Sequence, residues 1–194
     1  MTQAATSSEQ ERAFGGVIDV LEAVGAVYAI WGGWAVVAHG EPRFTLDMDI
    51  LLSPQGLLVD LFVKRLHETG YHVDTAAVFN ALAGGFFSVL HLHYHIKTDF
   101  YVPPPDSWLY SILQRRVHLP FGEYRQAAFI SSEAAVLTKL RAYADSQSTR
   151  HLDDIASIIR VQGHKLNQAH LGVEAARMGL LGVWRALWEA NTPR

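Results

Sequence analysis

Two aspartates that stand two residues apart are the most chemically suggestive feature of the sequence. Asp47 and Asp49 lie in residues 43–52, with apolar residues between and after them. Because side chains alternate between the faces of a β-strand, we expect both carboxylates to point the same way. Two carboxylates on one otherwise apolar strand repel each other, and a divalent cation such as Mg²⁺ or Mn²⁺ is the natural counter-charge. A solvated Asp-x-Asp at a strand end is the simpler alternative.

A glycine pair precedes the two aspartates. Gly32 and Gly33 separate a β-prone apolar run at residues 27–31 from a short helix expected over residues 34–39. A strand, two glycines and a helix suit phosphate binding, because glycine lets the backbone approach a ligand and helix N-terminal N–H groups attract anions. A tight turn that needs small residues accounts for the same pattern. The 13 residues between Gly33 and Asp47 leave room for one short helix and a return to the sheet.

A third acidic residue, Asp99, lies in a β-prone run at residues 96–102. If this strand lies beside the strand of Asp47, the three carboxylates form one cluster, suited to two metals and a triphosphate. A bound metal would lower the pKa of an attacking hydroxyl, and Asp99 would be the general base or its metal-bound equivalent. The condition is geometric, since Asp99 must share a face and a neighbourhood with the other two.

The elements that would position these residues follow from hydrophobic spacing and from turn residues. The chain up to about residue 130 mixes helices at 10–24, 34–39 and 54–70 with strands at 27–31, around the aspartates, and at 71–73, 86–92, 96–102, 116–119 and 124–129. A turn near residues 93–95 should join two of these strands. Beyond residue 131 the pattern is helical, with a helix capped by Ser132, another at 149–161 and two more after Asn167.

This pattern predicts an α+β fold, with a small mixed sheet flanked by helices and followed by a C-terminal helical region. The corresponding domains are residues 1–130 and 131–194.

Composition limits the class of protein. Of the 194 residues, 49% are hydrophobic and 18% are charged, as is typical of a globular protein. The net charge of −3 provides no overall positive potential that would attract nucleic acid, although a local basic patch remains open. The absence of cysteine excludes disulfides and thiolate sites and fits a cytoplasmic protein. The N-terminus lacks a signal-peptide pattern. Residues 23–40 carry no Asp, Glu, Lys or Arg, but their glycines favour a strand, turn and helix over a membrane span.

The ordered set of glycines and carboxylates resembles a known motif. Gly32-Gly33, then Asp47-x-Asp49, then Asp99 is similar to the motif of the DNA polymerase beta-like nucleotidyltransferase superfamily. One branch is more similar, the small prokaryotic nucleotidyltransferases related to abortive-infection (AbiEii-type) toxins. The resemblance to that branch extends over residues 17–188 and rests on Gly32-Gly33-Trp34-Ala35, Arg43-x-Thr45-x-Asp47-x-Asp49, Lys97-x-Asp99, Ser132-Glu133, Lys139-Leu140 and Ser148-x-Arg150 through Asp154-Ile155.

The resemblance implies a nucleotidyltransferase fold and a metal-dependent transfer of a nucleoside monophosphate from an NTP, such as ATP, to a hydroxyl, with release of pyrophosphate. Two Mg²⁺ or Mn²⁺ ions would bind with the NTP. Asp47 and Asp49 would hold both ions and Asp99 the catalytic one.

The remaining residues of the motif would bind the nucleotide. Gly32 and Gly33 would hold the β- and γ-phosphates. Lys139 would reach the triphosphate, with a solvated helix lysine as the alternative. Arg43 and Thr45 would contact phosphate or orient a carboxylate, with a structural hydrogen bond as the alternative.

Two other function classes remain open. One is a nucleotide-binding, antitoxin-like or regulatory module without turnover, and the other is a zinc protein built on His91, His93 and His95, whose alternation would share a face only if no turn intervened. The acceptor of the transferase hypothesis (a small molecule, RNA or protein) and its base preference leave no mark in the sequence.

Overall fold

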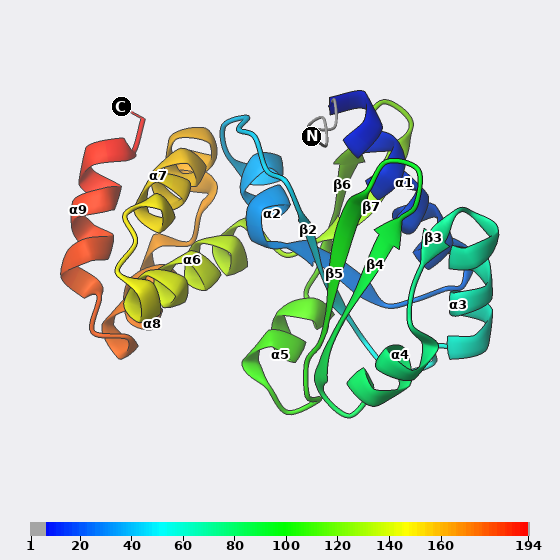
Figure 1. The fold of residues 1–194 in the computed structure, drawn as a ribbon. Helices are drawn as coiled ribbons and strands as arrows, with labels where there is room; N and C mark the ends of the chain where they lie inside the picture. Colours follow the sequence, from blue (N-terminus) through cyan, green and yellow to red (C-terminus); the bar gives the residue numbers. More distant parts are fainter. Residues whose placement is uncertain (1–6, 194) are drawn as a thin grey trace. The chain divides into compact units, whose positions relative to one another are not determined.

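The structure, a computed structural model, describes residues 7–193, without the side chains of Ser7 and Ser8. It contains two compact units (Figure 1). The sheet unit comprises the chain up to Trp31 and Leu46–Phe129, and the helical unit comprises Gly32–Thr45 and the chain from Ile130. The chain therefore passes between the units after Trp31, Thr45 and Phe129. The predicted division into domains 1–130 and 131–194 stays a prediction; by compactness, residues 32–45 group with the C-terminal helices.

The described part of the sheet unit is built on one mixed sheet of seven strands, in the order β3-β4-β5-β2-β1-β7-β6. The β2–β5 and β1–β7 pairs are parallel and the other pairs are antiparallel. The strands are β1 (Tyr28–Trp31), β2 (Met48–Leu52), β3 (Tyr71–His72), β4 (Gly85–His91), β5 (Ile96–Val102), β6 (Val117–Phe121) and β7 (Arg125–Phe129).

Helices α1, α3, α4 and α5 belong to the sheet unit, and the other helices to the helical unit. They are α1 (Ser7–Ala23), α2 (Gly32–His39), α3 (Val59–Glu68), α4 (Thr75–Ala81), α5 (Trp108–Gln114), α6 (Ser132–Ser146), α7 (Arg150–Gln162), α8 (Gln168–Arg177) and α9 (Leu181–Asn191), with a 3₁₀ turn at Gly163–Lys165.

An aromatic cluster fixes which face of the sheet is core. Phe62 of α3 lies edge-to-face with Phe87 and Phe100, at ring-centroid distances of 6.4 and 5.8 Å, and those two rings stack at 4.7 Å. Phe87 of β4 and Phe100 of β5 are paired residues, so both point to the face that α3 covers. Since side chains alternate along a strand, Asp99 points to the opposite face.

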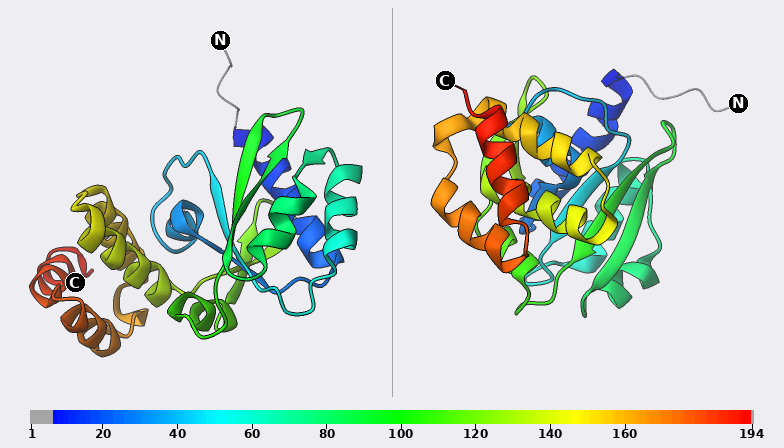
Figure 2. Two further views of the ribbon diagram at one scale, coloured as in Figure 1. Left: turned by 60° about the horizontal axis from the view of Figure 1, so that its bottom comes forward. Right: turned by 90° about the vertical axis from the view of Figure 1, so that its left-hand side faces the viewer.

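The helical unit begins where β1 ends. Gly32 has φ +64°, a left-handed conformation that favours glycine, and it turns the chain from strand to helix. Helix α2 packs against α6 and α7, and α9 packs against α7 and α8 (Figure 2). Ser131 rather than Ser132 caps α6, since its hydroxyl oxygen accepts a hydrogen bond from the Ala134 N–H at 3.2 Å.

The predicted fold class is confirmed, and the positions of most elements agree with the sequence pattern. The strand expected at 96–102 coincides with β5, and the expected turn joins β4 to β5. Two short helices, α4 and α5, were not predicted. Strand β2 begins only at Met48, so Asp47 and the residues before it lie outside the strand. Within residues 7–193, no helix is both long and apolar enough to span a membrane.

A buried histidine predicts a pH dependence of stability. Nε2 of His39 donates a hydrogen bond to the carbonyl oxygen of Ile130 at 2.7 Å, and burial lowers the pKa of His39 below its ordinary value of 6.5. The folded state therefore favours the neutral ring, so this stability is present above the ordinary pKa and is lost as the pH falls. His39→Gln keeps a donor but cannot titrate. Between about pH 8 and pH 5 its melting temperature should fall less than that of the wild type.

Thermal unfolding followed by circular dichroism measures the effect, with His118→Gln on exposed β6 as the matched control. The dependence of the melting temperature on pH should be weaker in His39→Gln than in the wild type but should not disappear, because burial also lowers the pKa of His91 and His151. Equal slopes for the wild type and His39→Gln would contradict the assignment.

Candidate active site

One row of paired residues crosses the sheet and carries the acidic residues. Asp49 of β2 is paired with Asp99 of the parallel neighbour β5. On either side, Trp31 of β1 is paired with Asp49, and Ser88 of β4 is paired with Asp99. Paired residues point to one face, so the structure brings these four side chains to the face opposite α3. We call Trp31, Asp49, Asp99 and Ser88 the acidic row.

Asp47 precedes β2 and is exposed, whereas Asp49 is half-buried and Asp99 is 7% exposed. The charge of Asp47 nevertheless acts on this face. The pKa of Tyr101, two residues beyond Asp99, is raised first by burial and then by the charges of Asp49, Asp99 and Asp47. All three carboxylates therefore act on one phenol, as expected if they lie around one region of the sheet.

Lys97 is the main partner of Asp99, and the sequence interpretation did not assign it a role. Its Nζ donates to Asp99 Oδ2 at 2.6 Å, while Ser88 Oγ donates to Oδ1 at 2.6 Å. The bond to Asp99 raises the pKa of Lys97, and the charges of Asp99 and Asp47 raise it further. The signal was present in the sequence, because residues 97 and 99 share a face of any unbroken strand.

Aromatic rings border the acidic row on the same face. The Tyr101 ring lies edge-on to Trp31 at 5.1 Å and is tilted against Phe86 at 5.1 Å. Phe86 is paired with Tyr101 and is 49% exposed. The carboxylates therefore border a surface that is partly aromatic and open to solvent.

The donor set of Asp47, Asp49 and Asp99 has the chemistry for Mg²⁺ or Mn²⁺, since both prefer carboxylate oxygens. Among residues 7–193, however, no three His, Asp or Glu side chains are placed to hold a metal ion together. The contacts of Asp99 supply a reason, because both of its oxygens already accept hydrogen bonds. A shared metal site on these three carboxylates stays a prediction.

The three histidines of the zinc alternative do not share a face, because the turn after His91 separates it from His93 and His95.

The helical unit brings together most of the other predicted residues. A Cβ placed on Gly33 would lie 2.4 Å from Thr45 Oγ1 and 3.5 Å from Arg43 Nη2. Glycine at position 33 therefore lets the segment with Arg43 and Thr45 pack closely against the first turn of α2. Arg43 and Thr45 lie in a loop rather than on the strand that the sequence pattern indicated.

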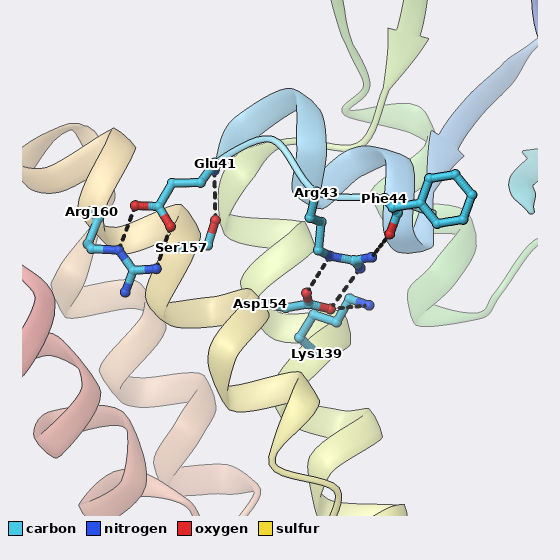
Figure 3. A network of polar contacts seen from close by, with 7 residues as sticks. All are labelled: Glu41, Arg43, Phe44, Lys139, Asp154, Ser157 and Arg160. Carbon is cyan, nitrogen blue, oxygen red and sulfur yellow. Dashed lines mark hydrogen bonds and ion pairs between the residues drawn. The ribbon is translucent and has the colours of Figure 1, made fainter. Parts of the chain in front are cut away.

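Asp154 of α7 joins two of the predicted cations (Figure 3). Its Oδ1 lies 2.8 Å from Arg43 Nε, and its Oδ2 lies 2.8 Å from Lys139 Nζ. Lys139 is 8% exposed and Asp154 only 2%, so Lys139 is not a solvated helix lysine. Two cations surround one carboxylate, which leaves a net positive charge on the three residues. The i, i+4 spacing of Arg150 and Asp154 on α7 would permit an ion pair, but the structure pairs Asp154 with Arg43 and Lys139.

The loop that carries Arg43 is fixed to α7 at its start. The Glu41 N–H donates to Ser157 Oγ at 2.7 Å, and Arg160 Nε donates to Glu41 Oε1 at 2.8 Å (Figure 3). A Cβ on Gly40 would lie 2.5 Å from the same Ser157 oxygen, so glycine is needed for this approach. These contacts hold the backbone just before Arg43 and thereby orient its guanidinium.

Comparison with known proteins identifies the fold. No family model and no curated protein matches the sequence. The structure of ANT(2″)-Ia in complex with adenylyl-2″-tobramycin matches with a TM-score of 0.60 at 15% identity, over 88% of this chain and 97% of that chain. An antigenic nucleotidyltransferase-like protein from Paracoccidioides brasiliensis matches with a TM-score of 0.59 at 16% identity, over 98% and 96% of the two chains. At these identities the likeness establishes the fold, which is a nucleotidyltransferase fold with C-terminal helices.

The close approach of Thr45 to Gly33 predicts that even a methyl side chain at position 33 lowers the stability of the protein. Gly33→Ala should destabilise the protein by about 1–3 kcal/mol, because the new methyl group overlaps the Thr45 hydroxyl. Gly182→Ala in α9 is the matched control. A Cβ there meets nothing within 4 Å, so this change should stabilise by about 0.5–1 kcal/mol. Chemical denaturation measures both, and adding Thr45→Ala to Gly33→Ala should recover part of the loss. A neutral Gly33→Ala would contradict the close approach.

The charges around Asp154 predict an order of stabilities. Asp154→Ala leaves buried Lys139 and half-buried Arg43 without their carboxylate and should cost about 3–5 kcal/mol. Lys139→Met leaves an Arg43–Asp154 pair of balanced charge and should cost far less. The neighbouring Asp153→Ala is the control, since Asp153 is exposed. Denaturant titration measures the three variants. If Lys139→Met proved as costly as Asp154→Ala, Asp154 would not be the common partner on which both cations depend.

Proposed function

We propose that this protein is a metal-dependent nucleotidyltransferase that moves a nucleoside monophosphate from an NTP to a hydroxyl acceptor and releases pyrophosphate. The observation that carries the proposal is the pairing of Asp49 with Asp99 on parallel neighbouring strands of a nucleotidyltransferase fold. Asp47 adds a third carboxylate whose charge acts on the same face. Two adjacent acidic residues on a sheet are costly unless a cation balances them, which supports a catalytic use.

The carboxylates would divide the chemistry between them. Asp47 and Asp49 would hold Mg²⁺ or Mn²⁺, and Asp99 would hold the catalytic ion. Bound cations would neutralise charge on the phosphates and lower the pKa of the attacking hydroxyl. A carboxylate oxygen of Asp99 would accept the proton of that hydroxyl as the general base. Ser88 orients Asp99 by donating to its other oxygen.

The helical unit would bind the triphosphate. Gly32 and Gly33 begin α2, and their N–H groups would bind the β- and γ-phosphates. Arg43 and Lys139 form a cluster with net positive charge around Asp154, which favours an anionic ligand. Burial and then the charge of Lys139 lower the pKa of His151, while the charge of Asp154 opposes them. Thr45, held against Gly33, would contact phosphate or orient Arg43.

The acceptor and the nucleotide can be ranked for testing. ANT(2″)-Ia is seen with adenylyl-2″-tobramycin, so ATP and an antibiotic hydroxyl are the first pair to test. RNA and protein acceptors follow. The sequence motifs favour the branch related to abortive-infection toxins, which would make the protein cytoplasmic and part of a toxin–antitoxin-like system.

A second candidate function is a nucleotide-binding regulatory or antitoxin-like module without turnover. The Lys97–Asp99 contact favours it, because this carboxylate is already neutralised by the chain itself. Both candidates predict that an NTP with Mg²⁺ raises the melting temperature, since a ligand that binds only the folded state stabilises it. Only the transferase releases pyrophosphate when an acceptor is present.

Carboxamide variants test the catalytic assignment. Asp49→Asn and Asp99→Asn should each lower pyrophosphate release by at least about 100-fold, because removing one charge disturbs both cation binding and proton transfer. Labelled NTP incubated with cell extract identifies the acceptor, and coupled pyrophosphate detection then measures the rate. Asp60→Asn, on exposed α3 of the same unit, is the control and should retain activity. Unchanged activity in Asp99→Asn would refute the role of Asp99.

A further inference from the structure

The strongest unexplained contact in the sheet unit is the ion pair between Lys97 and Asp99. We propose that Lys97 Nζ occupies, in the metal-free protein, the position at Asp99 that a divalent cation takes, so that metal binding is an exchange of one cation for another. The inference rests on the proposed function, and it assigns Lys97 the role of a positioning residue that competes with the metal.

The first argument is the geometry at Asp99. Its two oxygens have different partners, the neutral hydroxyl of Ser88 on Oδ1 and the ammonium of Lys97 on Oδ2, each at 2.6 Å. A metal could bind beside Ser88, because a hydroxyl donor does not carry charge. It could not bind Oδ2 at the oxygen distance of about 2.0–2.1 Å that Mg²⁺ requires while the ammonium remains there.

The second argument is the charge on this face. Asp47, Asp49 and Asp99 together carry three negative charges, and Lys97 returns one positive charge. Asp47 and Asp99 both act on Lys97, and Tyr101 lies in the field of all four groups. Several carboxylates on one face favour a dication over a monocation at Oδ2. Without a metal, Lys97 reduces the repulsion that would otherwise separate Asp49 from Asp99.

The third argument is the ease with which Lys97 can leave. Its side chain is 46% exposed, although that of Asp99 is only 10% exposed. Lysine places a compact charge on a flexible four-carbon stem, so the half-exposed ammonium can return to water when it leaves Asp99. Lys97 can therefore turn into solvent while Asp99 stays fixed by Ser88 and by its strand.

The test uses the full chain and Mn²⁺ alone as the probe. Free Mn²⁺ is followed by electron paramagnetic resonance for the wild type and for Lys97→Met, which keeps the stem and removes the charge. Lys97→Met should bind Mn²⁺ more tightly by roughly 5- to 150-fold, the usual range of coupling between two ligands. Lys97→Arg keeps the charge and should resemble the wild type.

Three controls separate competition from other effects. Lys64→Met removes an exposed lysine from α3 of the same unit and should leave Mn²⁺ affinity unchanged. Ser88→Ala frees Oδ1 without removing charge and should not reproduce the gain. Adding Asp99→Asn to Lys97→Met should abolish it. Thermal unfolding gives a second readout, because Mn²⁺ should raise the melting temperature more in Lys97→Met than in the wild type.

Equal or weaker Mn²⁺ binding by Lys97→Met, or a gain that survives Asp99→Asn, would overturn the inference. The failure of the proposed function would look different. Tighter Mn²⁺ binding by Lys97→Met, without nucleotide transfer by the wild type, would support the exchange and count against the enzyme. Transfer by the wild type, with no change of Mn²⁺ affinity in Lys97→Met, would support the enzyme and count against the exchange.

Discussion

The repulsion between Asp49 and Asp99 is the constraint on which the sheet unit depends. Parallel pairing of β2 with β5 places these carboxylates next to each other, and neither can turn to the core face that α3 covers. The structure compensates locally. Lys97 adds a positive charge and Ser88 a hydroxyl donor at Asp99, while Asp49 remains half-buried. The sheet thus holds a pair of like charges that its backbone ladder imposes and its side chains only partly neutralise.

The helical unit has the opposite imbalance. Half-buried Arg43 and buried Lys139 both contact buried Asp154, so one carboxylate serves two cations. Each unit therefore has an excess charge of its own, negative on the sheet face and positive around Asp154. In the proposed enzyme, the negative face of the sheet unit would bind the cations and the positive cluster of the helical unit the triphosphate. Buried ion pairs rarely stabilise a fold, so the cluster around Asp154 is not readily explained as a device for stability.

The sequence predicted the helices and strands better than it predicted which side chains contact one another. The sequence pattern of residues 96–102 predicted strand β5 and the position of Asp99 on it. The glycine pair predicted the junction between β1 and α2. The partners depend on contacts distant in the chain, which no local pattern encodes. Asp154 illustrates this, because it contacts Arg43, which lies 111 residues away in the chain. The short helices α4 and α5 escaped prediction because seven residues give too little periodicity.

The fold determines which acidic residues lie together, but it does not determine the groups around them. Strand pairing creates the acidic row, so any chain with this sheet and these aspartates places them together. The groups around the row are set by individual side chains. Trp31, Tyr101 and half-exposed Phe86 form an aromatic border on the acidic face, and Lys97 adds a cation. The acidic row therefore follows from strand pairing, whereas the aromatic border and the Lys97 cation come from this chain's own side chains.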